Sequence, residues 1–326
     1  MDRYTSQIAF LGKKAHEHLS KSTVAVIGLG ALGSVAAELL ARAGIGTIIL
    51  IDHDIVELSN LQRQALYDEK DISKLKAEAA SAKLKKINSS IEIIPQAQHI
   101  DETTIKTITA GLILDCTDNL ETRFIINKYC HAKRIPWVHA AAVGSIGIIL
   151  PITNNPDTYC FNCIYANAKS SLTCGDKGIL NTTSYATASF QVTEAIKMLT
   201  KQKHSDLIRF NSWTNTFDLI KVKKNPSCDI CTKKETASRE KATISFTISK
   251  CTTRAGYSAK PSKNIHLNLT TLKQHFNTIV ETPIVLVIKE NETEIIVHEF
   301  GEILFKTMTD EKKMHTIAKK IYEVGL

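Results

Sequence analysis

A glycine-rich turn between two apolar segments constrains the fold of this chain more than any other feature. Residues 23–27 (TVAVI) form a continuous β-prone run, and GLGALG follows directly. Apolar residues then recur at helical spacing from Leu32 to Ala43, and a second apolar run, residues 47–51, ends at Asp52. A strand buried on both faces of a parallel sheet is apolar along its whole length. The pattern therefore predicts a strand–turn–helix–strand unit of an α/β fold.

The three glycines of this turn and the acid that follows the second strand have a physical use in nucleotide binding. Glycines let backbone N–H groups at a helix N-terminus approach a phosphate, and the acid accepts hydrogen bonds from a ribose. Here these residues are Gly28, Gly30, Gly33 and Asp52. By itself the spacing is also typical of domains that bind NAD(P) or a flavin.

A dense group of polar and basic side chains follows Asp52. Its members are Asp54, Ser59, Asn60, Arg63, Gln64 and, near the start of a helix expected over residues 71–87, Lys76. A triphosphate needs guanidinium, ammonium and amide groups because negative charge develops as pyrophosphate leaves. A nicotinamide oxidoreductase is the alternative, but it would use the glycines and Asp52 and leave Arg63 and Lys76 without a role.

Another apolar strand is expected over residues 111–116, and Asp118 and Asn119 follow it. Ligands of open α/β sheets bind beyond the carboxyl ends of the strands. We therefore expect Asp118 to reach the same crevice as Gly28 and Asp52. An Asp at the end of a strand can also serve as a helix N-cap.

Four cysteines form two C-x-x-C pairs, Cys160 with Cys163 and Cys228 with Cys231. Four thiolates are the tetrahedral set that Zn²⁺ takes in a closed structural site. The long separation between the pairs means that the metal would join distant segments of one fold. A redox C-x-x-C is the alternative, but redox motifs do not normally occur as two pairs.

Further apolar runs predict antiparallel strands next to the glycine-turn unit. Residues 137–152 form two runs that turn at Gly144, and residues 207–222 contain two more. We therefore expect a Rossmann-like, largely parallel sheet with antiparallel additions in an ATP-binding domain of residues 1–231.

The remaining residues have a different texture. Residues 232–243 are polar and charged, which predicts a linker. Residues 244–326 contain short β-like runs and end in a helix with Met314, Ile317, Ala318 and Ile321 on one face. We expect a small α+β domain there, and no motif indicates its chemistry.

Charge and hydropathy exclude several classes of protein. The formal net charge is +8, but the lysines are scattered, which favours a solvated surface with an acidic partner or nucleotide over nucleic acid. The first residues lack the apolar run of a signal peptide. The longest apolar stretch, residues 138–152, is broken by glycines and a proline and is too short to span a bilayer. We expect a cytoplasmic protein without a membrane segment.

Two segments carry a resemblance to a known family. Residues 52–64, DHDIVELSNLQRQ, resemble the D-x-D-x-V-x-x-S-N-L-x-R-Q signature of the ThiF/MoeB/HesA group, the bacterial relatives of ubiquitin-activating enzymes. Residues 118–123, DNLETR, are similar to the family's D-N-x-x-T-R. The resemblance runs from about Arg3 to Cys231. It implies an adenylyltransferase that uses ATP and Mg²⁺ and carries a structural Zn²⁺.

The resemblance also implies a substrate, the C-terminal Gly-Gly tail of a small ubiquitin-like sulfur-carrier protein of the ThiS or MoaD type. Its carboxylate attacks the α-phosphate of ATP, pyrophosphate leaves, and the acyl-adenylate is ready to become a thiocarboxylate for thiamine or molybdopterin biosynthesis. A sulfurtransferase or a cysteine desulfurase would deliver the sulfur. Two alternatives remain, a short peptide as the substrate and an inactive scaffold.

The roles implied by the resemblance fall on particular residues. Asn60, Arg63 and Lys76 align the phosphates and neutralise their charge, Asp118 holds Mg²⁺, and Asn119 lies beside the nucleotide. The wider nucleotide-binding set adds Gly28, Gly30, Gly33, Asp52, Asp54, Ser59 and Gln64.

Two further positions bear on the mechanism that the resemblance implies. Cys174 matches the position of a family cysteine that can link covalently to the carrier, although it can also be read as a spare loop cysteine. The family opens with R-Y-x-R-Q, and its second arginine reaches the ATP of a partner subunit, which implies a homodimer. That position is Ser6 here, so Arg3, Lys13 or Lys14 would have to substitute.

Overall fold

The computed structural model divides the chain into two compact units. The first comprises Met1–Asp52 and Val56–Lys234, and the second comprises His53–Ile55 and Glu235–Leu326. None of the helices in the described part of the chain combines the length and the hydropathy needed to cross a bilayer. The structure describes residues 3–166, 178–232, 246–250, 256–262, 265–290 and 293–326.

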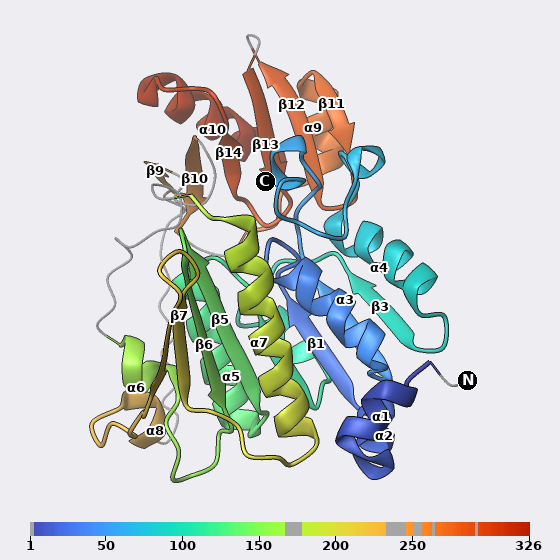
Figure 1. The fold of residues 1–326 in the computed structure, drawn as a ribbon. Helices are drawn as coiled ribbons and strands as arrows, with labels where there is room; N and C mark the ends of the chain where they lie inside the picture. The colour runs from blue at the N-terminus through green and yellow to red at the C-terminus, as the bar shows by residue number, and fades with distance from the viewer. Residues whose placement is uncertain (1–2, 167–177, 233–245, 251–255, 263–264, 291–292) are drawn as a thin grey trace. The chain divides into compact units, whose positions relative to one another are not determined.

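The first unit contains an eight-stranded sheet with the strand order β3-β2-β1-β4-β5-β6-β7-β8 (Figure 1). The strands from β3 to β5 pair in parallel, and β6, β7 and β8 add antiparallel strands at one end. This confirms the predicted Rossmann-like sheet with antiparallel additions. The strands are β1 (Thr23–Ile27), β2 (Thr47–Ile51), β3 (Glu92–Gln96), β4 (Leu112–Asp115), β5 (Trp137–Val143), β6 (Ile146–Ile152), β7 (Leu207–Asn211) and β8 (Thr216–Ile220).

Helices cover both faces of this sheet. On one face α3 (Gly33–Ala43) lies between α4 (Lys76–Ile87) and α7 (Asn181–Leu199), and α5 (Leu120–Lys133) lies on the other face (Figure 1). Each face has its own buried apolar cluster. The shorter helices of the first unit are α1 (Thr5–Leu11), α2 (Lys13–Ser20), α6 (Phe161–Tyr165) and α8 (Asp229–Thr232), with 3₁₀ turns η1 (Leu58–Asn60), η2 (Glu69–Asp71) and η3 (Thr104–Thr107).

The predicted helix over residues 71–87 begins later than expected. Asp71 ends the 3₁₀ turn η2, and Ser73 has a φ of 73°, which a right-handed helix cannot contain. The helix α4 therefore starts at Lys76. This start places Lys76 in the first turn, where N–H groups are not used within the helix.

The second unit is a six-stranded antiparallel sheet with the order β11-β12-β13-β14-β10-β9 and two helices. The C-terminal helix buries Met314, Ala318 and Ile321 against this sheet, as the helical spacing predicted. The elements are β9 (Phe246–Lys250), β10 (Tyr257–Pro261), α9 (Leu269–His275), β11 (Thr278–Glu281), β12 (Val285–Glu290), β13 (Thr293–His298), β14 (Ile303–Phe305) and α10 (Glu311–Gly325).

The glycine turn is packed too closely to accept side chains at two of its three glycines. A Cβ at Gly33 would lie 1.8 Å from the carbonyl oxygen of Gly28, and one at Gly28 would lie 2.8 Å from the carbonyl oxygen of Cys116. Gly28 also has a φ of +87°, which L side chains rarely adopt. In contrast, the nearest atom to a Cβ at Gly30 is 3.8 Å away.

We predict that Gly33→Ala destabilises the chain and that Gly30→Ala does not. The new methyl group at position 33 meets a backbone oxygen that cannot move without displacing β1 or α3, so about 3 kcal/mol of unfolding free energy should be lost. Urea unfolding of the two variants measures the difference. Equal stability of the variants would contradict the close packing of the turn.

Candidate nucleotide site and cysteine cluster

Asp52 is held directly against the glycine turn. It follows the last residue of β2, and its Oδ2 accepts a hydrogen bond from the N–H of Leu29 at 2.6 Å. The side chain is buried, with 8% of its surface exposed. The predicted acid and the predicted phosphate-binding turn are therefore parts of one site.

Lys76 is joined to the same turn through Tyr67. The Tyr67 hydroxyl lies 3.0 Å from the carbonyl oxygen of Leu29 and 3.4 Å from that of Lys76. Both Tyr67 and Lys76 are buried. A lysine with 6% exposure at a helix start is unusual for a solvated side chain, and its place beside the turn agrees with a role at phosphates.

The polar loop that contains Arg63 is fixed to the helix that follows the turn. The N–H of Ala65 donates to Ser34 Oγ at 3.1 Å, and the Gln64 amide is the group nearest to Gly30. Gln64 itself is buried. The loop therefore lies against the phosphate-binding turn.

Within this loop, the predicted site residues also hold one another. Asn60 is buried and accepts a hydrogen bond from the N–H of Glu57 at 3.2 Å. Arg63 Nη1 donates to the carbonyl oxygen of Ser59 at 2.9 Å. The guanidinium is thus positioned by the backbone of the SNLQR segment and not by a carboxylate.

The loop after β4 approaches the glycine turn at Gly28, where the backbone of Cys116 and Thr117 is in contact range. Asp118 is exposed on this loop. The N-cap of α5 is Asn119, whose Oδ1 accepts from the N–H of Thr122 at 2.9 Å. The N-cap role considered for Asp118 therefore belongs to Asn119.

Among the remaining predicted site residues, Asp54 has a carboxylate oxygen within 4.8 Å of a carboxylate oxygen of Asp52. Asp54 belongs to the second unit, where its Oδ1 lies 3.4 Å from His53 Nε2. Cys174 lies outside the described residues. The residues joined to the turn by contacts are thus Asp52, Asn60, Arg63, Gln64, Lys76 and the segment that carries Asp118.

Three basic residues, Arg3, Lys13 and Lys14, were considered as substitutes for the family arginine whose position is occupied by Ser6 in this chain. Arg3 Nη1 donates to the carbonyl oxygen of Ile87 at 2.7 Å and so caps the end of α4 in its own chain. Lys13 and Lys14 are exposed on α2. These two lysines are the better candidates to reach outward.

A buried hydrogen-bonded pair of His139 and Asp115 at the end of β4 was not predicted from the sequence. His139 Nδ1 and Asp115 Oδ2 are 2.6 Å apart, and strand pairing sets the two residues opposite each other. Both side chains are inaccessible to solvent. The only sequence signals for this pair were an acid at the end of an apolar strand and a histidine within the next strand.

The pKa values of His139 and Asp115 are both lowered, for different reasons. Burial lowers the pKa of His139 because it disfavours the imidazolium, and this outweighs the opposing effect of Asp115. For Asp115, burial alone would raise the pKa, but the hydrogen bond from His139 and the nearby charges outweigh burial and lower it. The pair is therefore a neutral imidazole that donates from Nδ1 to a carboxylate.

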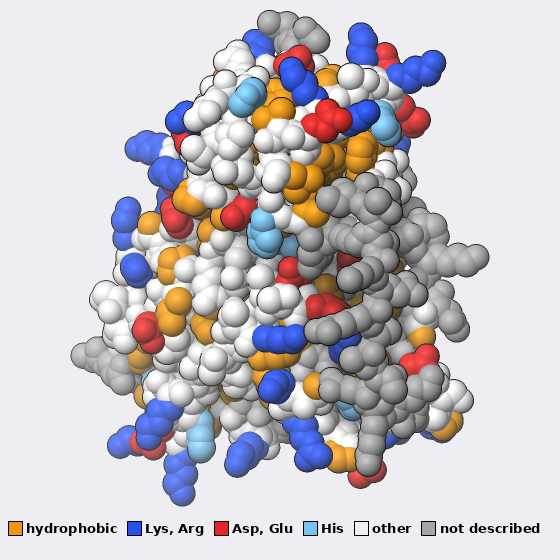
Figure 2. Space-filling model, turned by 180° about the vertical axis from the view of Figure 1, so that it is seen from behind, with side chains coloured by type: hydrophobic (Ala, Val, Ile, Leu, Met, Phe, Trp, Pro, Cys, Tyr) orange, Lys and Arg blue, Asp and Glu red, His pale blue; other side chains and the backbone are white. Residues whose placement is uncertain are grey.

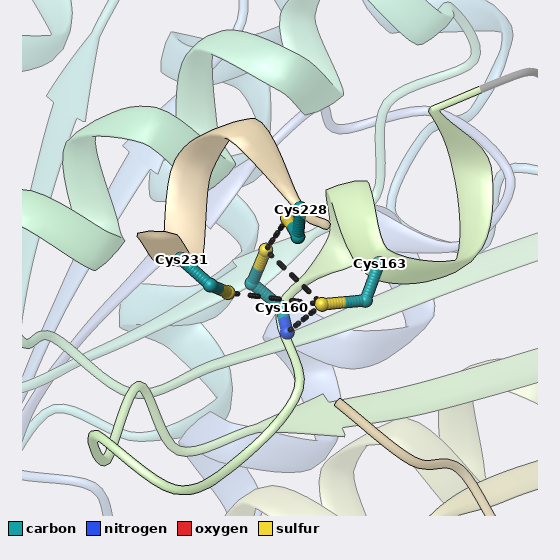
Figure 3. Close-up of side chains that lie close together, drawn as sticks. All are labelled: Cys160, Cys163, Cys228 and Cys231. Atoms are coloured by element: carbon teal, nitrogen blue, oxygen red, sulfur yellow. Dashed lines mark hydrogen bonds between the residues drawn. The ribbon is translucent and has the colours of Figure 1, made fainter. Parts of the chain in front are cut away.

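The four cysteines of the two C-x-x-C pairs converge from α6 and α8 (Figure 3). The Sγ distances are 3.9 Å for Cys160–Cys163, 3.7 Å for Cys160–Cys228 and 3.7 Å for Cys163–Cys231. Tetrahedral Zn²⁺ with Zn–S bonds of about 2.3 Å requires sulfur atoms about 3.8 Å apart. The donor set therefore fits Zn²⁺, and it joins segments far apart in the sequence.

Hydrogen bonds favour a thiolate at Cys228, whereas burial and the neighbouring cysteines raise the pKa values of Cys160 and Cys231. Asn162 Nδ2 donates to Cys228 Sγ at 3.6 Å, and the buried Asn127 donates to Cys160 Sγ at 3.7 Å. Burial opposes a charge on Cys228, but backbone N–H groups and Asn162 outweigh burial and lower its pKa to about 7. Neither asparagine was predicted as a donor: Asn162 is a variable position of the first C-x-x-C pair, and Asn127 lies outside any motif.

Lysine and arginine side chains occur at several separate places on the face drawn in Figure 2. They do not gather there into one patch. This distribution agrees with the interpretation of the positive charge as a solvated surface.

Comparison with known proteins decides the family. The sequence model of the ThiF family matches residues 4–230, which covers the whole sheet of the first unit and the cysteine cluster except Cys231. The chain belongs to the ThiF family.

Relatives of this ThiF-family chain are adenylyltransferases. It is 35% identical over 239 residues to the molybdopterin-synthase adenylyltransferase of Escherichia coli, covering 71% of this chain and 96% of that protein. It is also 35% identical over 243 residues to the sulfur carrier protein ThiS adenylyltransferase of Bacillus subtilis, covering 72% of each chain. Each match leaves out more than a quarter of this chain.

A solved structure supports the fold and the use of ATP. Escherichia coli MccB, whose crystal structure was determined with ATP, superimposes with a TM-score of 0.63 and 25% identity, over 71% of this chain and 73% of MccB. The family and this neighbour agree with the prediction of an ATP-using adenylyltransferase, and they do not favour the nicotinamide alternative.

We predict that the chain loses stability as the pH falls below the ordinary histidine pKa of 6.5. The unfolded chain then binds a proton at His139 that the folded chain does not, because burial lowers the folded pKa. Stability is fully present above pH 6.5 and is lost below it, with up to about 1 kcal/mol attributable to this residue. Urea unfolding from pH 7.5 to about pH 5.5 measures the slope.

His139→Asn should flatten this pH dependence, since the amide donates to Asp115 without titrating. His131→Asn serves as the matched variant and should change the slope less, because His131 is only partly buried. A wild-type slope in His139→Asn would contradict the assignment.

Proposed function

We propose that this chain uses Mg²⁺ and ATP to adenylylate the C-terminal glycine of a small ubiquitin-like sulfur-carrier protein. The observation that carries the proposal is the set of contacts that joins Asp52, Lys76, the Arg63 loop and the Asp118 loop to one glycine turn. The names of the relatives support the substrate class, because they act on molybdopterin synthase and on ThiS.

The chemistry needs alignment and neutralisation of charge more than proton transfer. The terminal carboxylate of the carrier is already an anion at neutral pH, so it can attack the α-phosphate without a general base. The N–H groups at the start of α3 and the Lys76 ammonium face the phosphates, and Arg63 stabilises the charge that develops on the leaving pyrophosphate.

Asp118 is the residue that would hold Mg²⁺. It is an exposed carboxylate on the loop that contacts Gly28, so an ion held by Asp118 would be available to a triphosphate at the glycine turn. Mg²⁺ is usually bound by one or two carboxylates together with substrate phosphates. The ion supplies charge neutralisation on the triphosphate.

The partners follow from the same proposal. Homodimers would complete each site with a basic residue from the N-terminal arm, and Lys13 or Lys14 fits this role better than Arg3. Sulfur delivery to the adenylated carrier would come from a sulfurtransferase or a cysteine desulfurase, with Cys174 as the residue that could link to the carrier.

We predict carrier-dependent exchange of pyrophosphate into ATP by the wild-type chain. Lys76→Met should reduce the exchange rate by about 100-fold or more, because it removes a positive charge from a buried position at the phosphates. Lys86→Met, on the exposed side of the same helix, is the matched control and should retain the rate.

Each alternative gives its own result in this assay. Exchange with a short peptide, and none with a ubiquitin-like carrier, would mean that the substrate is a peptide. Absence of exchange with any carrier would favour an inactive scaffold. Protection from heating by NADH and not by ATP would overturn the reaction class.

We also propose that Zn²⁺ occupies the four cysteines, and we predict about one zinc per chain by elemental analysis. Cys228→Ser should lose the metal and lower the Tm, because the ion joins α6 to α8. Cys130→Ser changes a buried cysteine outside the cluster and should keep the zinc. A wild-type chain free of zinc after expression with the metal would favour a redox pair.

A further inference from the structure

Within the segment between β4 and α5, Thr117 is held by three hydrogen bonds. The carboxylate of Asp115 accepts hydrogen bonds from the Thr117 N–H at 3.0 Å and from its hydroxyl at 2.6 Å. Arg123 Nη2 donates to the Thr117 carbonyl oxygen at 2.5 Å. The N–H, the hydroxyl and the C=O of Thr117 are therefore all fixed, and Asp118 is the next residue.

The groups that hold Thr117 are themselves fixed from neighbouring elements. His139 on β5 binds the second carboxylate oxygen of Asp115 at 2.6 Å, and Arg123 Nε lies 3.7 Å from the same oxygen. Gln191 on α7 donates to the main-chain carbonyl oxygens of Asp115 and Val138, both at 2.9 Å, and so ties β4 to β5. This set of Asp115, Thr117, Arg123 and His139 is called the Thr117 clamp below.

The fold does not require the buried polar and charged groups of the Thr117 clamp. Asn119 already caps α5, and backbone pairing already holds β4. Burying a carboxylate at 0% exposure and a guanidinium at 12% costs free energy, and apolar residues of similar size would often stabilise a core equally well. A buried polar network whose members are hydrogen-bonded fixes one local geometry. Next to a site, such a network indicates that it positions a neighbouring residue.

We propose that Asp115, His139 and Arg123 are positioning residues for the adenylylation reaction, which set the direction of the Asp118 carboxylate through Thr117. The proposal rests on the proposed role of Asp118 at Mg²⁺. Mg²⁺ demands near-ideal octahedral geometry at about 2.1 Å, so a small rotation of the Asp118 backbone weakens the site. Residues that orient a metal ligand typically change metal affinity by about 10- to 100-fold when they are replaced.

The test is the binding of Mn²⁺, as a spectroscopic probe for Mg²⁺, to the full chain in the presence of ATP, followed by electron paramagnetic resonance. His139→Phe keeps a ring against Phe161 and Tyr165 but removes the donor to Asp115. It should weaken Mn²⁺ binding about tenfold. His139→Asn restores an N–H donor near the position of Nδ1 and should bind Mn²⁺ nearly as the wild type does.

Arg123→Met is the second variant, and it keeps the test decisive if His139→Phe does not fold. It leaves the Thr117 carbonyl oxygen without its donor and should also weaken Mn²⁺ binding about tenfold. Tyr159→Phe is the matched control, because it removes a buried hydroxyl that donates to the Pro151 carbonyl oxygen away from the clamp. It should lower stability and leave Mn²⁺ binding unchanged.

The outcomes separate the clamp from the proposed function. If folded His139→Phe or Arg123→Met binds Mn²⁺ with ATP as tightly as the wild type, the proposed positioning role of the clamp is wrong. Wild-type Mn²⁺ binding without carrier-dependent exchange would contradict the proposed function and leave the clamp supported by its variants. A wild-type chain that binds no Mn²⁺ with ATP overturns both.

Discussion

The close approach of the glycine turn to the end of β4 is the constraint on which the site depends. The carbonyl oxygen of Cys116 and that of Gly28 occupy the space that side chains at positions 28 and 33 would need. Because these backbones touch, the loops after β1 and after β4 meet at the carboxyl edge of the sheet. A ligand bound beyond the carboxyl ends of the strands therefore has both loops within reach. Asp52, through its bond to Leu29, adds the loop after β2 to the same place.

Local hydrogen bonds then direct the functional side chains from this junction. Tyr67 links the turn to the main chain of Lys76 at the start of α4, and Ser34 holds the loop that carries Arg63. The Thr117 clamp performs the same task for Asp118. In each case a neutral or buried group holds the main chain at a charged residue that we propose to contact the substrate. The arrangement follows the general requirement that a catalytic electrostatic environment be preorganised.

Much of this arrangement could be predicted from the sequence, because its signals are local. The strands β1, β2 and β4 are continuous apolar runs, the three glycines have a diagnostic spacing, and the two C-x-x-C pairs predict the cluster that the structure brings together. The start of α4 could not be predicted, since it depends on the backbone conformation of Ser73. The Asp115–His139 pair is set by the register of β4 and β5, which no local pattern encodes. The strands β9 and β10 are only five residues long each and were not singled out among the short β-like runs of residues 244–326.

A crystal structure of the chain with Mg²⁺ and a non-hydrolysable ATP analogue would show directly whether the glycine turn and the charged residues around it form one triphosphate site. We predict that the triphosphate contacts the N–H groups of the glycine turn, that Arg63 and Lys76 point at its phosphates, and that Asp118 binds the metal. A nucleotide bound elsewhere, or Arg63, Lys76 and Asp118 turned away from one another around it, would contradict the account.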